Sequence, residues 1–245
     1  MPTLTVIVPT FNEEDYIEDA LFSVKFADEI IVIDSFSTDK TVEIAKKFTS
    51  KILTRKFDNF SNQKNFALKE ATGEWVLFLD ADERVSHSLQ IEILQTIQNP
   101  KHEGYKINFP HFFMNRFLYH NSDDVLRLVK REGASFSGTV HEKLHCEGSI
   151  GKLKNIMLHF TYKGLSHYID KKESYAWFQA RHLYENNRGV TLFHLFFRPW
   201  YRFFRAMILK GGFRDGIPGL AVASIDAYGV FQRYAKLILL KRGMK

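Results

Sequence analysis

The chain has 245 residues, a formal net charge of +6 and an aromatic excess that comes from 23 phenylalanines and 10 tyrosines. This length suits one large α/β domain, or one domain with a substantial appendage. A single cysteine excludes an internal disulfide and fits a reducing compartment. We expect neither a signal peptide nor a membrane-spanning helix, because the first apolar run is short and no run reaches ~18 uncharged residues.

Apolar runs alternate with amphipathic segments over the first 100 residues. Strands are predicted at residues 4–8, 30–33, 51–55 and 75–79. Helices are predicted at residues 13–26, 62–71 and 88–98, and a further helix runs from its cap at residue 37 or 38 to residue 48. Asn12 is a candidate N-cap of the first helix, and Ser37 or Thr38 of the second. This alternation is typical of an α/β protein with a doubly wound, mostly parallel sheet.

The pattern changes after residue 104. Strands are predicted at residues 105–113 and 125–130, with a polar loop between them, and a third strand near 153–160. From Ile169 onward the sequence predicts helices. We therefore expect a sheet domain over residues 1–165 and a helical extension over residues 166–245.

The run Trp75–Leu79 is apolar throughout, which is typical of a strand that is buried on both faces. It is followed directly by Asp80, Asp82 and Glu83. A parallel strand delivers such residues to the carboxyl edge of the sheet, where α/β proteins bind ligands. Carboxylates suit Mg²⁺ or Mn²⁺, and these ions suit a diphosphate. The alternative is an ordinary polar turn that closes the strand.

Polar side chains follow each of the first four predicted strands. They are Thr10, Asn12 and Glu13, then Asp34 and Ser35, then Arg55, Asn62 and Lys64, and finally Asp80 and Asp82. Each group alone is explained by helix capping or turn formation. Their occurrence at successive strand ends favours a nucleotide site, with carboxylates for base or ribose and a cation for phosphate.

Three segments, at residues 8–14, 33–41 and 79–83, resemble the signatures of family 2 glycosyltransferases, which have the GT-A fold. Order and spacing agree over the first ~100 residues. Two later segments, at residues 139–144 and 211–216, resemble a narrower branch that contains the lipopolysaccharide-core β-1,4-glucosyltransferases. Related enzymes with other acceptors share the His-Glu pair of the first of these segments.

The resemblance implies a nucleotide-sugar pocket and assigns it these residues: Pro9, Thr10, Asn12, Glu13, Asp34, Lys64 and Asp80. Within it, Asp34 would contact the uracil or ribose, and Lys64 would lie near the base or the diphosphate. Asp80 would face the ribose or the sugar. Asp82 would bind the divalent metal, Mg²⁺ or Mn²⁺.

The Glu-Asp pair that usually supplies the catalytic acid residues of the family is absent, and His141-Glu142 stands in its place. Inverting transfer needs one carboxylate that takes the proton of the acceptor hydroxyl. Glu142 is therefore the candidate base, with an exposed surface carboxylate as the alternative. His141 and His159 are the other candidates, and His159 is either a further metal ligand or a structural histidine.

The charge is divided unevenly along the chain. Residues 1–150 carry 17 Lys and Arg against 23 Asp and Glu, a net −6, and residues 151–245 carry 17 against 5, a net +12. Arg198, Arg202 and Arg205 share one helical face, and aromatic residues fill much of the rest. This pattern suits either a helix at an anionic membrane surface or a helix docked on the sheet domain. It contains no nucleic-acid-binding motif.

Together these features predict a cytoplasmic, metal-dependent inverting glycosyltransferase that works peripherally at the inner face of the cell membrane. The resemblance suggests UDP-glucose as donor and a lipid-linked glycan, such as a lipopolysaccharide core, as acceptor. A sugar nucleotidyltransferase is an alternative, but residues 9–13 contain no glycine for a phosphate-binding loop. A non-catalytic membrane-binding module is a third possibility, against which the carboxylates at 80, 82 and 142 argue.

Overall fold

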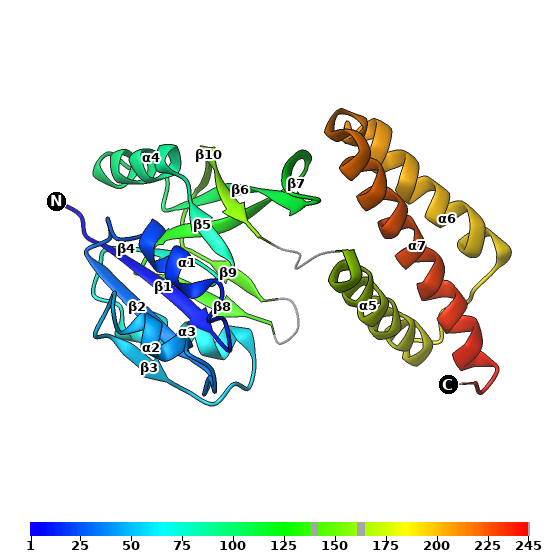
Figure 1. Cartoon of the computed structure of the whole chain (residues 1–245), viewed down its shortest axis with the longest axis horizontal. Helices are drawn as coiled ribbons and strands as arrows, with labels where there is room; N and C mark the ends of the chain where they lie inside the picture. Colours follow the sequence, from blue (N-terminus) through cyan, green and yellow to red (C-terminus); the bar gives the residue numbers. More distant parts are fainter. Residues whose placement is uncertain (139–141, 161–164, 245) are drawn as a thin grey trace. The chain divides into compact units, whose positions relative to one another are not determined.

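The computed structural model describes residues 1–138, 142–160 and 165–244 (Figure 1). It divides into two compact units. The first contains Met1–Phe109 and Asp123–His159, and the second contains Pro110–Ser122 and Phe160–Lys245. The expected domain boundary after residue 165 stays a prediction, and the second unit also includes a hairpin tip from the middle of the chain.

One eight-stranded sheet forms the frame of the first unit, in the order β3-β2-β1-β4-β7-β6-β10-β5. Its strands are β1 (Leu4–Thr10), β2 (Glu29–Asp34), β3 (Ile52–Thr54), β4 (Trp75–Phe78), β5 (Glu83–Val85), β6 (Gly104–Phe113), β7 (Arg116–Lys130) and β10 (Ile150–His159). Strands β3, β2, β1 and β4 pair in parallel, whereas β4 with β7 and β10 with β5 pair antiparallel. The predicted α/β sheet is confirmed.

The helices of the first unit cover both faces of this sheet. They are α1 (Ile17–Ser23), α2 (Thr41–Ala45), α3 (Phe60–Glu70) and α4 (His87–Gln98). Side chains alternate along β1, so that Val6 packs in one core with Leu21 of α1 and Ile93 of α4. Ile7 packs in the other core with Ala67 of α3. Both faces of β1 are therefore buried in apolar cores, which fixes the position of its carboxyl end.

The predicted caps of the first two helices are wrong. Helix α1 begins at Ile17 after Tyr16, and α2 begins at Thr41 after Lys40. Asn12 instead has a φ of 53°, and its side chain accepts a hydrogen bond from the neighbouring loop. The side chains of Asn12 and Ser37 do not cap their own helices and instead join the two loops to each other.

The polar loop expected between residues 113 and 125 is also absent. Strands β6 and β7 are joined at Met114 and Asn115, whose φ angles of 49° and 60° suit a tight hairpin turn. Polar residues near the turn continue β7 as an extended strand. Two short strands that the sequence did not reveal, β8 (Ser135–Ser137) and β9 (Lys143–His145), pair antiparallel.

The second unit consists of helices α5 (Leu165–Glu185), α6 (Leu192–Phe204) and α7 (Gly216–Lys241) with the tip of the β6–β7 hairpin. Phe113 and Leu118 of the hairpin pack with Tyr168 of α5 and Val222 of α7. Pro199 lies inside α6. Among the described residues, no helix combines the length and apolar content that crossing a membrane requires.

Candidate active site

The loops that follow β1 and β2 are joined by hydrogen bonds into one edge of the sheet. The backbone N–H of Asn12 donates to Ser37 Oγ at 2.9 Å, and the N–H of Thr38 donates to Asn12 Oδ1 at 2.8 Å. The N–H of Glu13 donates to Thr41 Oγ1 at 2.8 Å. Asn12 tolerates the left-handed conformation that this junction needs. The structure therefore gives Asn12 a part in shaping the edge, and its contact with a nucleotide stays a prediction.

Asp34 lies at the end of β2 and is only 2% exposed. Its two carboxylate oxygens accept hydrogen bonds from the backbone N–H of Ser37 at 3.0 Å and from the Ser37 hydroxyl at 2.5 Å. These hydrogen bonds fix the orientation of the Asp34 carboxylate at the carboxyl end of β2. Its predicted contact with uracil or ribose is not tested by the structure.

A cavity of about 210 Å³ lies over the carboxyl ends of β1 and β4. It brings together five of the residues that the sequence assigned to donor and metal: Pro9, Thr10, Glu13, Asp80 and Asp82. Phe57 and Phe60 line it as well, and they also line a larger apolar cavity of about 780 Å³. The two cavities offer polar groups on one side and aromatic rings on the other, which suits a ligand with a phosphate part and a ring.

Thr10 shows that the smaller cavity is suited to a polar ligand. Its side-chain oxygen is buried and has no hydrogen-bond partner among the described residues. Buried hydroxyl groups are nearly always hydrogen-bonded in folded proteins. Because Thr10 lines the cavity, a hydroxyl or phosphate oxygen of a bound ligand would satisfy it.

Two cations hold Asp80 at the cavity wall. Arg127 Nη2 lies 2.7 Å from Asp80 Oδ2, and Lys64 Nζ lies 3.2 Å from Oδ1. Burial raises the pKa of Asp80, but the charges of Arg127 and Lys64 outweigh this effect and hold the pKa below its usual value. Glu83 also pairs with Arg127. Burial and the nearby Asp80 raise the pKa of Glu83 to about 7, against the opposing charge of Arg127.

Lys64 connects Asp80 with the candidate base. Its side chain, on α3, is 3% exposed, and its Nζ lies 3.4 Å from Glu142 Oε1 and 5.5 Å from the centre of the Phe136 ring. One buried ammonium therefore contacts carboxylates that are 62 residues apart in the sequence. The structure brings Glu142 to the predicted donor site. His141, the neighbouring candidate, lies outside the described residues.

Asp82 and His159 form a pair, with 3.2 Å between Asp82 Oδ2 and His159 Nε2. Burial lowers the pKa of His159, but the hydrogen bond and charge of Asp82 outweigh it and raise the pKa. No group of three or more potential metal-ligating side chains occurs among the described residues. Two protein ligands still fit Mg²⁺ or Mn²⁺, because such ions usually keep waters and take further oxygens from substrate phosphates.

Sequence reasoning missed Arg127 and Gln63. Arg127 lies between Leu126 and Leu128 in a predicted strand, and a lone charge in an apolar strand is the signal that could have found it. Gln63 is 2% exposed and donates to Ser35 Oγ at 2.9 Å, with nothing in its sequence context to distinguish it. Arg55, one of the cations that the sequence places at this edge, pairs with Asp58, and a part for it in phosphate binding stays a prediction.

The sequence profile described as Glycosyl transferase family 2 matches residues 5–161. The chain belongs to this family. An uncharacterized glycosyltransferase of Rickettsia typhi is 29% identical over 97% of this chain and 87% of its own length. The lipopolysaccharide core biosynthesis glycosyltransferase LpsC of Rhizobium meliloti is 26% identical over 96% and 91%. The family predicted from the three motifs is therefore confirmed.

Solved structures support the same fold. The crystal structure of Staphylococcus aureus TarS 1–349 in complex with UDP-GlcNAc has a TM-score of 0.51 and 16% sequence identity, over 99% of this chain and 92% of that one. The GT-A fold expected from the sequence is therefore confirmed, together with its C-terminal helices. The chain is a glycosyltransferase.

Proposed function

We propose that this glycosyltransferase is metal-dependent and inverting, and moves glucose from UDP-glucose onto a lipid-linked glycan such as a lipopolysaccharide core. The observation that carries the proposal is the cavity that joins Thr10, Glu13, Asp80 and Asp82, with Glu142 linked to it through Lys64. The name of LpsC supports the acceptor class, and the UDP-GlcNAc of the TarS crystal supports a UDP-sugar donor.

The chain's own residues supply three roles. Glu142 accepts the proton of the acceptor hydroxyl, and Lys64 orients its carboxylate at 3.4 Å. Thr10 and Glu13, with Asp80 beside them, hold the donor in the cavity, which places the anomeric carbon for attack. Asp82 and His159 would hold the divalent cation, which supplies positive charge for the departing nucleoside diphosphate when it is bound.

The sugar nucleotidyltransferase alternative has little support in this geometry. Such an enzyme needs glycines whose backbone N–H groups surround a phosphate. Here the N–H groups of Asn12 and Glu13 are used by Ser37 and Thr41. The family assignment also favours sugar transfer.

A thermal-shift screen of nucleotide sugars, with and without Mn²⁺, tests the donor. A ligand at a hundredfold excess over its Kd stabilises a protein by about 2.7 kcal/mol. For a chain of this size that is a Tm increase of roughly 5–10 °C. We expect the largest increase for UDP-glucose with Mn²⁺, and less for UDP-glucose alone or for GDP-sugars. Equal Tm values in all mixtures would contradict the proposal.

We infer that the second unit attaches the enzyme to the anionic inner face of the cell membrane. Helix α6 exposes a continuous series of large apolar side chains: Leu192, Phe193, Phe196, Phe197, Trp200 and Phe204. Trp200 alone is 68% exposed. The arginines of the same helix lie on its other side, where Arg202 pairs with Asp226 of α7. The aromatic side of α6 is therefore the surface that would enter the lipid headgroup region, and the net +12 of residues 151–245 complements anionic lipid.

Replacing both Phe196 and Trp200 by Ser tests this attachment. Burial of one large apolar side chain is worth about 1.5–3 kcal/mol, so the double variant should bind vesicles of phosphatidylcholine and phosphatidylglycerol more weakly by at least about a hundredfold. Co-sedimentation measures the partitioning. Phe22→Ser is the control, because Phe22 is exposed in the first unit. Equal partitioning of the double variant and the wild type would show that the aromatic side of α6 does not attach the protein to the membrane.

A further inference from the structure

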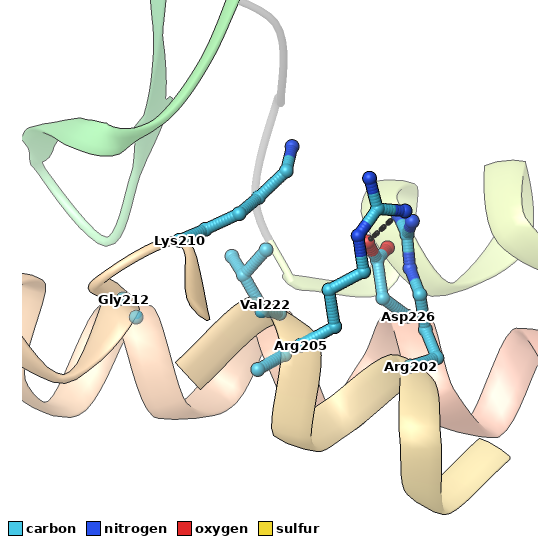
Figure 2. Close-up of a pocket in the computed structure, with 9 residues that line it drawn as sticks. Arg202, Arg205, Lys210, Gly212, Val222 and Asp226 are labelled. Atoms are coloured by element: carbon cyan, nitrogen blue, oxygen red, sulfur yellow. Dashed lines mark hydrogen bonds and ion pairs between the residues drawn. The ribbon is translucent and has the colours of Figure 1, made fainter. Parts of the chain in front are cut away.

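A third cavity, of about 650 Å³, lies among the three helices of the second unit. Most of the charged side chains that line it are cationic: Lys172 from α5, Arg198 and Arg202 from α6, Arg205 from the turn after α6, and Arg233 from α7. An adjoining recess shares Arg202 and Arg205 and adds Lys210 (Figure 2). We call these two spaces the basic cavity.

The cations of the basic cavity outnumber its anions. Asp226 is the only carboxylate among the described residues that line it. Figure 2 shows the ion pair of Arg202 with this carboxylate and labels Arg205 among the residues that line the recess. Asp226 is already occupied, because Lys172 Nζ lies 2.6 Å from one oxygen and Arg202 Nη2 lies 2.7 Å from the other. Burial raises the pKa of Asp226, but Lys172 and Arg202 outweigh this effect and lower it.

Asp226 therefore compensates one of the positive charges, and Arg198, Arg205 and Arg233 form no ion pair with a carboxylate among the described residues. Arg198 donates a hydrogen bond to the neutral hydroxyl of Tyr234. Arg233 has its Nε buried without a hydrogen-bond partner among the described residues. Burial lowers the pKa of Arg233, Tyr234 opposes this effect, and the charges of Arg202 and Arg198 add to it. A guanidinium nevertheless stays protonated in proteins, so these charges repel one another.

A buried guanidinium nitrogen without a partner, such as Nε of Arg233, is costly for a protein that binds nothing there. The cost is removed when an anion enters. Guanidinium groups match phosphate best, because their planar N–H pairs bind two oxygens at once. Tyr175 and Tyr201 also line the cavity, and tyrosine hydroxyls can donate to sugar or phosphate oxygens. The volume exceeds that of a single phosphate, which suits a phosphate carried on a larger polar group.

We propose that the basic cavity binds a phosphate group carried by the saccharide of the lipid-linked acceptor. This inference rests on the proposed function, which supplies the lipid-linked saccharide. Helix α6 offers two surfaces that match the two parts of such a molecule. Its exposed aromatic side faces the lipid, and its arginines line the cavity that receives the charged saccharide.

Direct binding tests the proposal independently of turnover. The probe is rough-type lipopolysaccharide in detergent micelles, used as isolated and after phosphatase treatment. We expect removal of the phosphates to weaken binding to the wild type about tenfold to a hundredfold, because charge-assisted hydrogen bonds are lost. The double variant Arg205→Gln with Arg233→Gln should bind both probes with the same, weaker affinity. Arg188→Gln with Arg242→Gln removes the same charge from exposed positions outside the cavity and should keep the difference.

Two results would overturn the assignment. Equal affinity of the wild type for both probes would show that phosphate is not recognised. Weaker binding of phosphatidylglycerol vesicles by the Arg205→Gln, Arg233→Gln variant than by the Arg188→Gln, Arg242→Gln control would show that the phosphate comes from a lipid headgroup. If the proposed function is wrong, the result differs: no sugar transfer from UDP-glucose is observed, but the phosphate-dependent binding of the wild type remains. An unchanged Tm and an unchanged circular dichroism spectrum serve as the test that both double variants are folded.

Discussion

Replacing Glu142 by Gln is expected to lower the single-turnover rate by about 10²–10⁴-fold, which is the usual contribution of a catalytic base. The amide is isosteric with the carboxylate and can still accept a hydrogen bond from Lys64, which lies 3.4 Å from Glu142 Oε1. The change therefore removes the proton acceptor and keeps the contact. Donor affinity should change little, because Glu142 would touch the acceptor hydroxyl and not the diphosphate.

The measurement is the donor affinity and the single-turnover rate of the same purified variant. Glu132→Gln is the matched control, since Glu132 is an exposed carboxylate on the same stretch of chain. Loss of donor binding together with turnover would indicate a structural role for Glu142. Full turnover would transfer the role of base to Asp123, Asp124 or His141. Asp124 is the weakest of these, because its two oxygens already accept from Asn108 at 2.8 Å and Lys152 at 2.7 Å.

The parallel half of the sheet could be predicted because its strands are buried on both faces. Trp75–Phe78 is apolar at every position and is buried at every position, so burial alone identifies it. The same reasoning located the edge on which Thr10 and Asp80 meet, because parallel strands end on one side. The pattern of apolar residues along the sequence is enough to predict these strands, because strand formation and burial depend on residues that are close together in the chain.

The polar contacts of the site could not be predicted in the same way. Lys64 looks like any lysine on an amphipathic helix, and its burial depends on Asp80 and Glu142, which are distant in the sequence. Asn12 looks like a helix cap, because capping and loop-to-loop bonding use the same short polar side chains. Only the fold decides which partner such a side chain meets. The cavity that the arginines of α6 line could not be predicted either, because residues of α5 and α7 form the rest of its wall.

Replacing Asp82 by Asn is expected to remove the metal-dependent part of UDP binding. A divalent cation contributes several kcal/mol to charge stabilisation in transfer of this kind. Its loss should lower kcat/KM on the order of a thousandfold. The fold should persist, because Asp82 is partly exposed and Asn can still hydrogen-bond His159. Titration calorimetry with UDP, in the presence and absence of Mn²⁺, isolates the contribution of the metal.

The pair of Asp82 with His159 adds a second readout to the same experiment. Asp82 raises the pKa of His159, so the imidazole of the metal-free protein holds its proton to a higher pH than usual. A metal ligand must be deprotonated, and Mn²⁺ binding would therefore release this proton and weaken as the pH falls. Wild-type protein should release the proton and Asp82→Asn should not, whereas Asp170→Asn, at an exposed position of α5, should match the wild type. Metal-dependent UDP affinity that is unchanged in Asp82→Asn would contradict the assignment. The metal ligand would then have to be sought among the other carboxylates that line the cavity. Glu13 would come first, because both oxygens of Asp80 already pair with Arg127 and Lys64.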